Sequence, residues 1–131
     1  MKKGFQDLVD EAMTQVKTYS VEEAKAKLGD ANVQFIDVRD IRELEREGVI
    51  PGAYHAPRGM IEFWVDPASP YFKPVFGEKK EFVFFCAAGW RSALTTKTVQ
   101  DMGLEPVAHI EGGFGAWKTQ GGKVEEKAKK S

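Results

Sequence analysis

The segment Phe82-Val83-Phe84-Phe85-Cys86-Ala87-Ala88-Gly89-Trp90-Arg91-Ser92 contains the only cysteine of the chain. Its first four residues are three phenylalanines and a valine, a composition typical of a strand buried on both faces. Small residues, an arginine and a helix-like stretch follow. Cys86 is therefore expected at the end of a strand and beneath the N-terminus of a helix, where a protein can stabilise a thiolate or hold an anion.

Three features of this loop favour the thiolate, which is the reactive form of a cysteine that is otherwise mostly protonated at neutral pH. The amides of residues 87–91 can turn inward as an anion-binding nest. A helix expected from Ser92 adds the positive end of its dipole, and Arg91 adds a permanent charge. The backbone can approach closely because the first residues are small, namely Ala87, Ala88 and Gly89. The alternative is a buried structural cysteine, a common core residue.

Composition limits the range of functions. The chain has 131 residues, 42% of them apolar and 30% charged, as expected for one globular domain. A net charge of -1 provides no basic footprint for nucleic acid. The sequence has no apolar run of membrane-spanning length and no apolar stretch typical of a signal peptide, so a cytoplasmic protein is expected. A single cysteine excludes an internal disulfide, an internal resolving thiol and a cysteine-based zinc site, and no metal or organic cofactor is expected.

Hydrophobic periodicity predicts an amphipathic helix over residues 4–16 that packs on its own domain, a domain over residues 17–122, and a disordered charged tail over residues 123–131. Strands are expected at residues 33–38, 82–85 and 106–110, with a short strand within 49–57. Helices are expected at residues 21–28, 40–47, 58–65, 92–102 and 113–120, the first of them capped by Ser20 and Glu23. Alternating strands and helices imply an α/β fold with a parallel sheet and helices on both faces, in which ligands bind at the carboxyl ends of the strands.

Four segments together resemble the rhodanese superfamily. They are Ile36-Asp37-Val38-Arg39 with Glu43, Gly48-Val49-Ile50-Pro51-Gly52-Ala53, the loop Cys86-Ala87-Ala88-Gly89-Trp90-Arg91-Ser92, and Glu111-Gly112-Gly113-Phe114-Gly115-Ala116-Trp117. One departure is Val49, where the family usually has His. The resemblance implies a rhodanese-like sheet of about five strands.

The resemblance also implies sulfur transfer without a cofactor. Cys86 would take a sulfur atom from a small anionic donor such as thiosulfate and pass it to cyanide, a thiol or a protein cysteine. The residues from Ala87 to Ser92 would form the substrate-binding loop, with Arg91 helping to bind the donor and Trp90 flanking the sulfur or the acceptor. Arg58, which follows the turn after Pro57, is a candidate for the rim of the site, or else an exposed surface arginine.

Asp37, Arg39 and Glu43 are expected to support the structure rather than to take part in the chemistry, because buried charges need partners. Glu43 lies four residues after Arg39 and is expected to pair with it. Neither histidine adjoins the loop in sequence, and His109 is expected to be a hydrogen-bonded core residue rather than a base.

Two other functions stay open. Cysteine phosphatases, and arsenate reductases with a similar loop, require the pattern C-x₅-R, in which an arginine encloses a tetrahedral anion. The segment from Cys86 to Arg91 is one residue shorter. A non-catalytic binding or regulatory module on the same fold is the second alternative, although such modules typically lose the cysteine.

Overall fold

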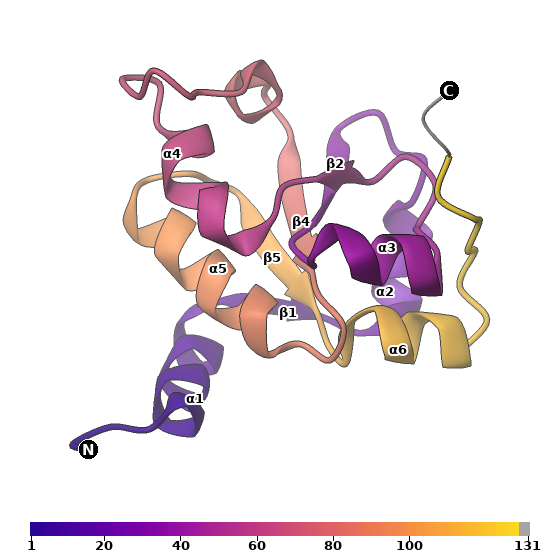
Figure 1. Ribbon diagram of the computed structural model, residues 1–131, viewed down its shortest axis with the longest axis horizontal. Helices are drawn as coiled ribbons and strands as arrows, with labels where there is room; N and C mark the ends of the chain where they lie inside the picture. Colours follow the sequence, from indigo (N-terminus) through magenta and orange to yellow (C-terminus); the bar gives the residue numbers. More distant parts are fainter. Residues whose placement is uncertain (129–131) are drawn as a thin grey trace.

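A five-stranded sheet forms the centre of the protein in the computed structural model, which describes residues 1–128 (Figure 1). The strands are β1 (Lys17–Tyr19), β2 (Val33–Asp37), β3 (Tyr54–His55), β4 (Glu81–Phe85) and β5 (Val107–Ile110). Their order is β1-β5-β4-β2-β3, and every neighbouring pair is parallel. All carboxyl ends therefore lie at one edge, with the end of β4 in the middle.

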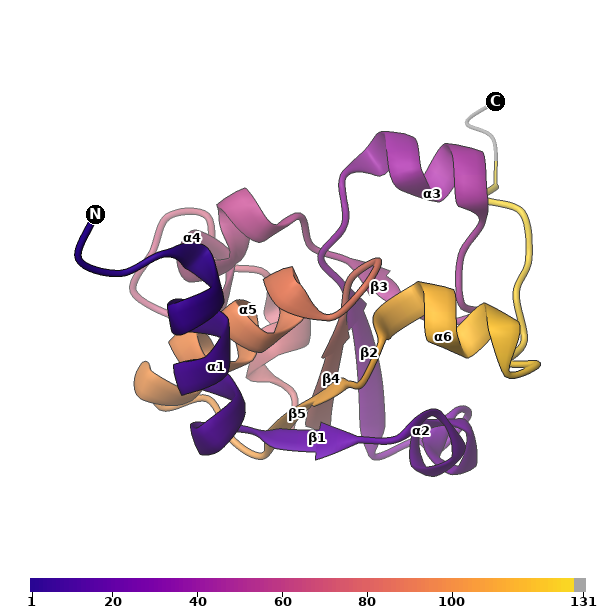
Figure 2. The same ribbon diagram turned by 90° about the horizontal axis from the view of Figure 1, so that it is seen from below.

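Helices cover both faces of the sheet, as the sequence predicts (Figure 2). They are α1 (Phe5–Gln15), α2 (Val21–Lys27), α3 (Ile41–Glu47), α4 (Ile61–Val65), α5 (Trp90–Asp101) and α6 (Gly113–Thr119), with short 3₁₀ turns at Arg58–Met60 and Pro74–Gly77. α2 and α6 pack on one face, and α4 and α5 on the other. α1 lies against α5 through the buried residues Val9 and Ala12. None of the helices within residues 1–128 has the length and hydrophobicity needed to cross a bilayer.

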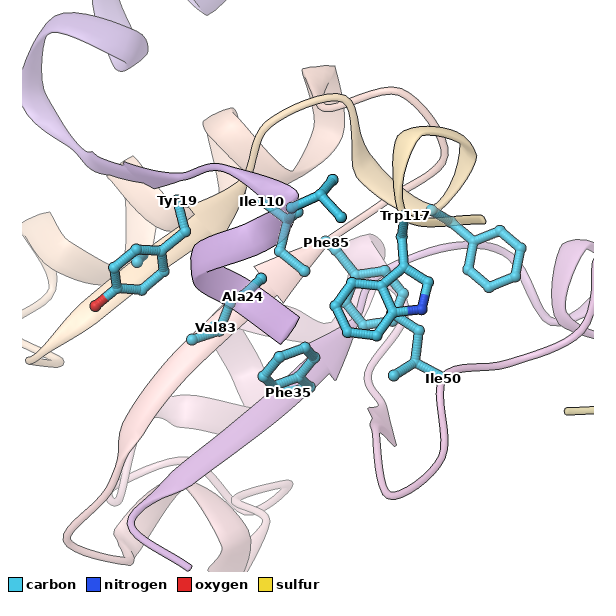
Figure 3. Packing of buried hydrophobic residues seen from close by; sticks show 11 residues of the cluster. Tyr19, Ala24, Phe35, Ile50, Val83, Phe85, Ile110 and Trp117 are labelled. Carbon is cyan, nitrogen blue, oxygen red and sulfur yellow. The ribbon is translucent and has the colours of Figure 1, made fainter. Parts of the chain in front are cut away.

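The alternation of side chains along β4 divides the core into two halves. Phe82 and Phe84 pack with residues of α4 and α5. Val83 and Phe85 point to the opposite face, where α6 contributes Trp117 (Figure 3). Each such side chain, when fully buried, stabilises the fold by about 1.5–3 kcal/mol, so a strand that is apolar on both faces belongs in the centre.

Away from the Cys86 loop, the structure differs from the sequence-based expectations in three places. β1 is a strand of three residues at the edge of the sheet, and its pattern of lysine, threonine and tyrosine does not distinguish it from a linker. The stretch 58–65, expected to be one helix, is a 3₁₀ turn followed by α4. The start of the tail expected to be disordered is instead tied to the fold, because Glu125 exchanges two backbone hydrogen bonds with Val49. The last three residues of that tail, 129–131, lie outside the described residues.

A buried ion pair connects β2 to its surroundings at the carboxyl edge. Asp37 and Arg39 are each only 1% exposed. The Arg39 guanidinium donates to both Asp37 oxygens, with Nη2–Oδ2 at 2.7 Å, and to the carbonyl of Gly48 at 2.9 Å. The Phe114 ring of α6 stacks on the same guanidinium at 4.1 Å. These contacts tie the end of β2 to the Gly48 turn and to α6, and the supporting role expected of Asp37 and Arg39 stays a prediction.

Arg39→Met is expected to lower the free energy of unfolding by about 3–5 kcal/mol, because it leaves the Asp37 carboxylate buried without a partner. Urea denaturation measures the loss. Arg42→Met is the matched control, since Arg42 pairs with Asp40 on the surface, and its effect should stay within about 0.5 kcal/mol. Equal losses in the two variants would contradict this assignment.

Candidate active site

Cys86 follows β4 directly and lies at the middle of the carboxyl edge. The residue is 1% exposed. Its sulfur accepts hydrogen bonds from the backbone amides of Gly89 at 3.1 Å and Ser92 at 3.3 Å, and Sγ lies 3.6 Å from the Ser92 hydroxyl oxygen. The sequence predicts inward amides over residues 87–91; those that reach the sulfur are at Gly89 and, one residue beyond this range, at Ser92.

Gly89 makes the tight turn of the loop possible. Its φ of 107° lies in the left-handed region, which a residue with a Cβ rarely adopts. α5 then begins at Trp90, two residues before the predicted start. Because the helix starts so early, the amide of Ser92 belongs to its first turn and faces the sulfur with the positive end of the helix dipole.

The N-terminus of α6 orients the other side of the loop. The Phe114 amide donates to the Cys86 carbonyl at 2.7 Å, and the Gly115 amide donates to the Ala87 carbonyl at 3.0 Å. A Cβ on Gly113 would lie 2.4 Å from the Cys86 carbonyl oxygen, and Gly113 has a φ of 59°. α6 thus fixes the position of the first two residues of the loop, and the residues that follow bring the Gly89 and Ser92 amides to the sulfur. Gly113 is therefore required by the close packing of α6 on the loop backbone.

Arg91 pairs with Glu43 of α3, which corrects one expectation. Its Nη1 and Nη2 donate to the two Glu43 oxygens at 2.8 and 2.9 Å. The expected pairing of Glu43 with Arg39 is wrong, because the buried Asp37 carboxylate takes the Arg39 guanidinium instead. The Arg91 guanidinium holds the pKa of the Glu43 carboxyl at about 2, and the carboxylate in turn raises the pKa of Arg91. Both groups stay charged across the physiological range.

Arg58, expected at the rim of the site, and Trp90, expected to flank the sulfur or the acceptor, have different surroundings. Arg58 donates to Glu62 at 2.9 Å and reaches Thr98 at 3.5 Å, contacts that direct it to α4 and to the later turns of α5. Trp90 is the first residue of α5 and is 53% exposed. Its ring packs on Phe5 of α1, with the ring centroids 4.9 Å apart. α1 therefore extends the wall of the site beside the loop.

His109 belongs to the surroundings of the site, although sequence reasoning placed it away from the loop. Its Nδ1 lies 3.1 Å from the Ser92 hydroxyl oxygen. Burial lowers the pKa of His109 from 6.5 to about 4, so the ring is neutral at pH 7 and a core role agrees with this. The pairing of β5 with β4 would have predicted this position, because it places His109 opposite Phe84 and on the same face of the sheet as Cys86.

Within residues 1–128, no group of three or more His, Cys, Asp or Glu side chains is arranged to hold a metal ion. What the geometry provides is a buried thiol that two backbone amides face, with a charged pair beside it. Such an arrangement stabilises a sulfur anion and suits a nucleophile.

Gly113→Ala is expected to lower the free energy of unfolding at least about twice as much as Gly29→Ala. Both glycines have positive φ, so either alanine costs about 1–2 kcal/mol in backbone strain. A Cβ at Gly29 meets open space, whereas one at Gly113 meets the Cys86 carbonyl. Urea denaturation compares the two variants. In the folded state, Cys86 should also be alkylated faster in Gly113→Ala, but not in Gly29→Ala. Equal losses of stability in the two variants would show that the close contact is not needed.

Comparison with known proteins identifies the family. A model of the rhodanese-like domain matches residues 20–120. YtwF of Bacillus subtilis, a candidate sulfurtransferase by its name, is 33% identical over 105 residues, which cover 79% of this chain and 92% of that protein. A rhodanese-like domain protein from Staphylococcus aureus has a TM-score of 0.65 at 29% identity, covering 86% of this chain and 100% of its own.

A solved structure from Rhodopseudomonas palustris, described as a protein of unknown function and possible tyrosine phosphatase, has a TM-score of 0.93 at 54% identity. The match covers 95% of this chain and 96% of that one. The family match extends from the capping serine of α2 through the Cys86 loop and α6. The chain therefore belongs to the rhodanese-like domain family.

Proposed function

We propose that the protein is a sulfurtransferase that carries sulfur as a persulfide on Cys86. The Cys86 thiolate attacks the outer sulfur of a donor such as thiosulfate. A bond forms between Sγ and that sulfur, the bond to the inner sulfur breaks, and sulfite leaves with the electron pair. Cyanide or an acceptor thiolate then attacks the outer sulfur of the persulfide, and Cys86 returns as a thiolate. Since the chain has no second cysteine, the acceptor is another molecule, a small thiol or a protein.

The observation that carries this proposal is the size and contents of the loop. The Gly89 and Ser92 amides close on one sulfur atom. In a cysteine phosphatase the arginine of the loop binds the phosphate through two hydrogen bonds. Here Nη1 and Nη2 of Arg91 both donate hydrogen bonds to the Glu43 carboxylate instead. The name of the Rhodopseudomonas palustris relative makes phosphatase activity the competing outcome. A cytoplasmic location, where thiols stay reduced, would keep Cys86 available.

Incubation with thiosulfate is expected to increase the intact mass of the protein by one sulfur atom. Cyanide should remove the increment and yield thiocyanate, and Cys86→Ser should show neither the increment nor thiocyanate. Mass spectrometry and a colorimetric thiocyanate assay follow the two steps. A protein that gains no sulfur but hydrolyses aryl phosphates through Cys86 would be a phosphatase, and one that does neither would be a binding module.

Arg91→Ala is expected to raise the KM for thiosulfate roughly tenfold, because it leaves the Glu43 carboxylate uncompensated beside the loop and repels an anionic donor. The melting temperature should fall by only a few degrees, since the pair is partly exposed. Adding Glu43→Gln should recover part of the lost affinity. Steady-state kinetics measure both variants. If Arg91→Ala instead fails to fold, the pair is a structural support and not a determinant of donor binding.

A further inference from the structure

A line of hydrogen-bonding side chains runs from the sulfur away from the loop and ends in the N-terminal segment. Cys86 Sγ lies 3.6 Å from Ser92 Oγ, and Ser92 Oγ lies 3.1 Å from His109 Nδ1. On the far side of the ring, His109 Nε2 lies 3.1 Å from Thr18 Oγ1 and 3.2 Å from Met13 Sδ. Cys86, Ser92 and His109 are buried. The line thus connects the nucleophile to β1 and α1, which precede the stretch that matches the family model.

The surroundings of the ring decide which nitrogen carries its proton. A neutral imidazole has one N–H, and buried His109 is neutral at pH 7. The thioether of Met13 has no hydrogen to donate and can only accept. Nε2 lies within reach of that sulfur and of the Thr18 hydroxyl oxygen, so the proton belongs on Nε2. Nδ1 is then a bare acceptor that faces the hydroxyl of Ser92.

The proton of Ser92 is consequently drawn away from the thiol. A serine hydroxyl has one hydrogen and two lone pairs. Two acceptors other than the sulfur lie within reach of that hydrogen, His109 Nδ1 at 3.1 Å and the Gly89 carbonyl at 3.3 Å. When the hydrogen points at Nδ1, the nearer of the two, a lone pair of Oγ faces the sulfur, which suits a neutral S–H that donates to Oγ. An anionic sulfur gains nothing from this lone pair and relies on the amides of Gly89 and Ser92.

We propose that His109 is a positioning residue that holds the Ser92 hydroxyl hydrogen away from Cys86 and so withholds one hydrogen bond from the anionic sulfur. A thiolate with fewer hydrogen bonds is less stable but more nucleophilic, because nucleophilicity falls as the anion is stabilised. The missing hydrogen bond raises the free energy of the thiolate before it attacks, but it does not raise the free energy of the transition state. Met13, which can only accept, sets the tautomer, and this makes α1 part of the site.

This inference rests on the proposed function only in taking Cys86 as the nucleophile, and its test requires no sulfur donor. The readout is the rate at which iodoacetamide alkylates Cys86 as a function of pH, whose midpoint reports the thiol–thiolate balance. The charged groups around the thiol are Arg91 with Glu43, and Asp37 with Arg39. None of the substitutions below alters them.

His109→Phe is expected to shift the alkylation midpoint to lower pH by about one pH unit, because the freed Ser92 hydroxyl then donates to the thiolate, whose charge makes it a stronger acceptor than the neutral Gly89 carbonyl at 3.3 Å. The alkylation rate of the fully ionised thiolate should fall. Thr18→Val is the matched control: it removes the other hydrogen bond of the same ring, leaves Met13 as acceptor for Nε2, and should leave the midpoint unchanged. A midpoint that stays or rises in His109→Phe would overturn the proposal.

The route through Ser92 is tested in a double variant. In a Ser92→Ala background, His109→Phe should produce no further shift, since no hydroxyl remains to be redirected. The same shift in that background would show that His109 acts by another path. If His109→Phe does not fold, nitrogen NMR of the unaltered protein decides: a bare Nδ1 and a protonated Nε2 at pH 7 are required, and the opposite tautomer would refute the proposal.

Discussion

The contact between the start of α6 and the backbone of the Cys86 loop is the constraint on which the site depends. Two backbone amides of α6 donate hydrogen bonds to the carbonyls of Cys86 and Ala87, and the helix and loop lie so close together that a Cβ on Gly113 would not fit between them. Holding these two carbonyls fixes the course of the loop, and the residues that follow bring the Gly89 and Ser92 amides to the sulfur. The electrostatic environment of the sulfur is therefore produced by backbone packing, which needs no charged side chain in contact with the thiol.

Two arginine–carboxylate pairs support this arrangement in different ways. The Asp37–Arg39 pair is buried, and through the Phe114 ring it holds α6 against the carboxyl edge of the sheet. The Glu43–Arg91 pair is partly exposed and connects α3 to the first turn of α5. The first pair contributes mainly to the position of the loop, because breaking it leaves a buried charge. The second contributes mainly to the potential that an incoming anion meets.

Much of the fold followed from local pattern, and the exceptions have physical reasons. The apolar run before Cys86 marked the central strand, and the capping pair of Ser20 and Glu23 marked the start of α2 as observed. β1 was not predicted, because a three-residue strand at the edge of the sheet is stabilised by its pairing with β5 and has no hydrophobic pattern of its own. The sequence wrongly predicted Arg39 as the partner of Glu43, because spacing along one segment does not reveal that α5 brings Arg91 to the same carboxylate.

The sequence by itself determined the α/β class, the placement of a lone thiol between a buried strand and a helix, and the short span from Cys86 to Arg91. Those features depend on residue type and on spacing along the chain. Only the tertiary structure decided which amides reach the sulfur, which carboxylate holds Arg91, and that His109 stands behind Ser92. These depend on strand order and helix packing, which bring together residues far apart in the chain.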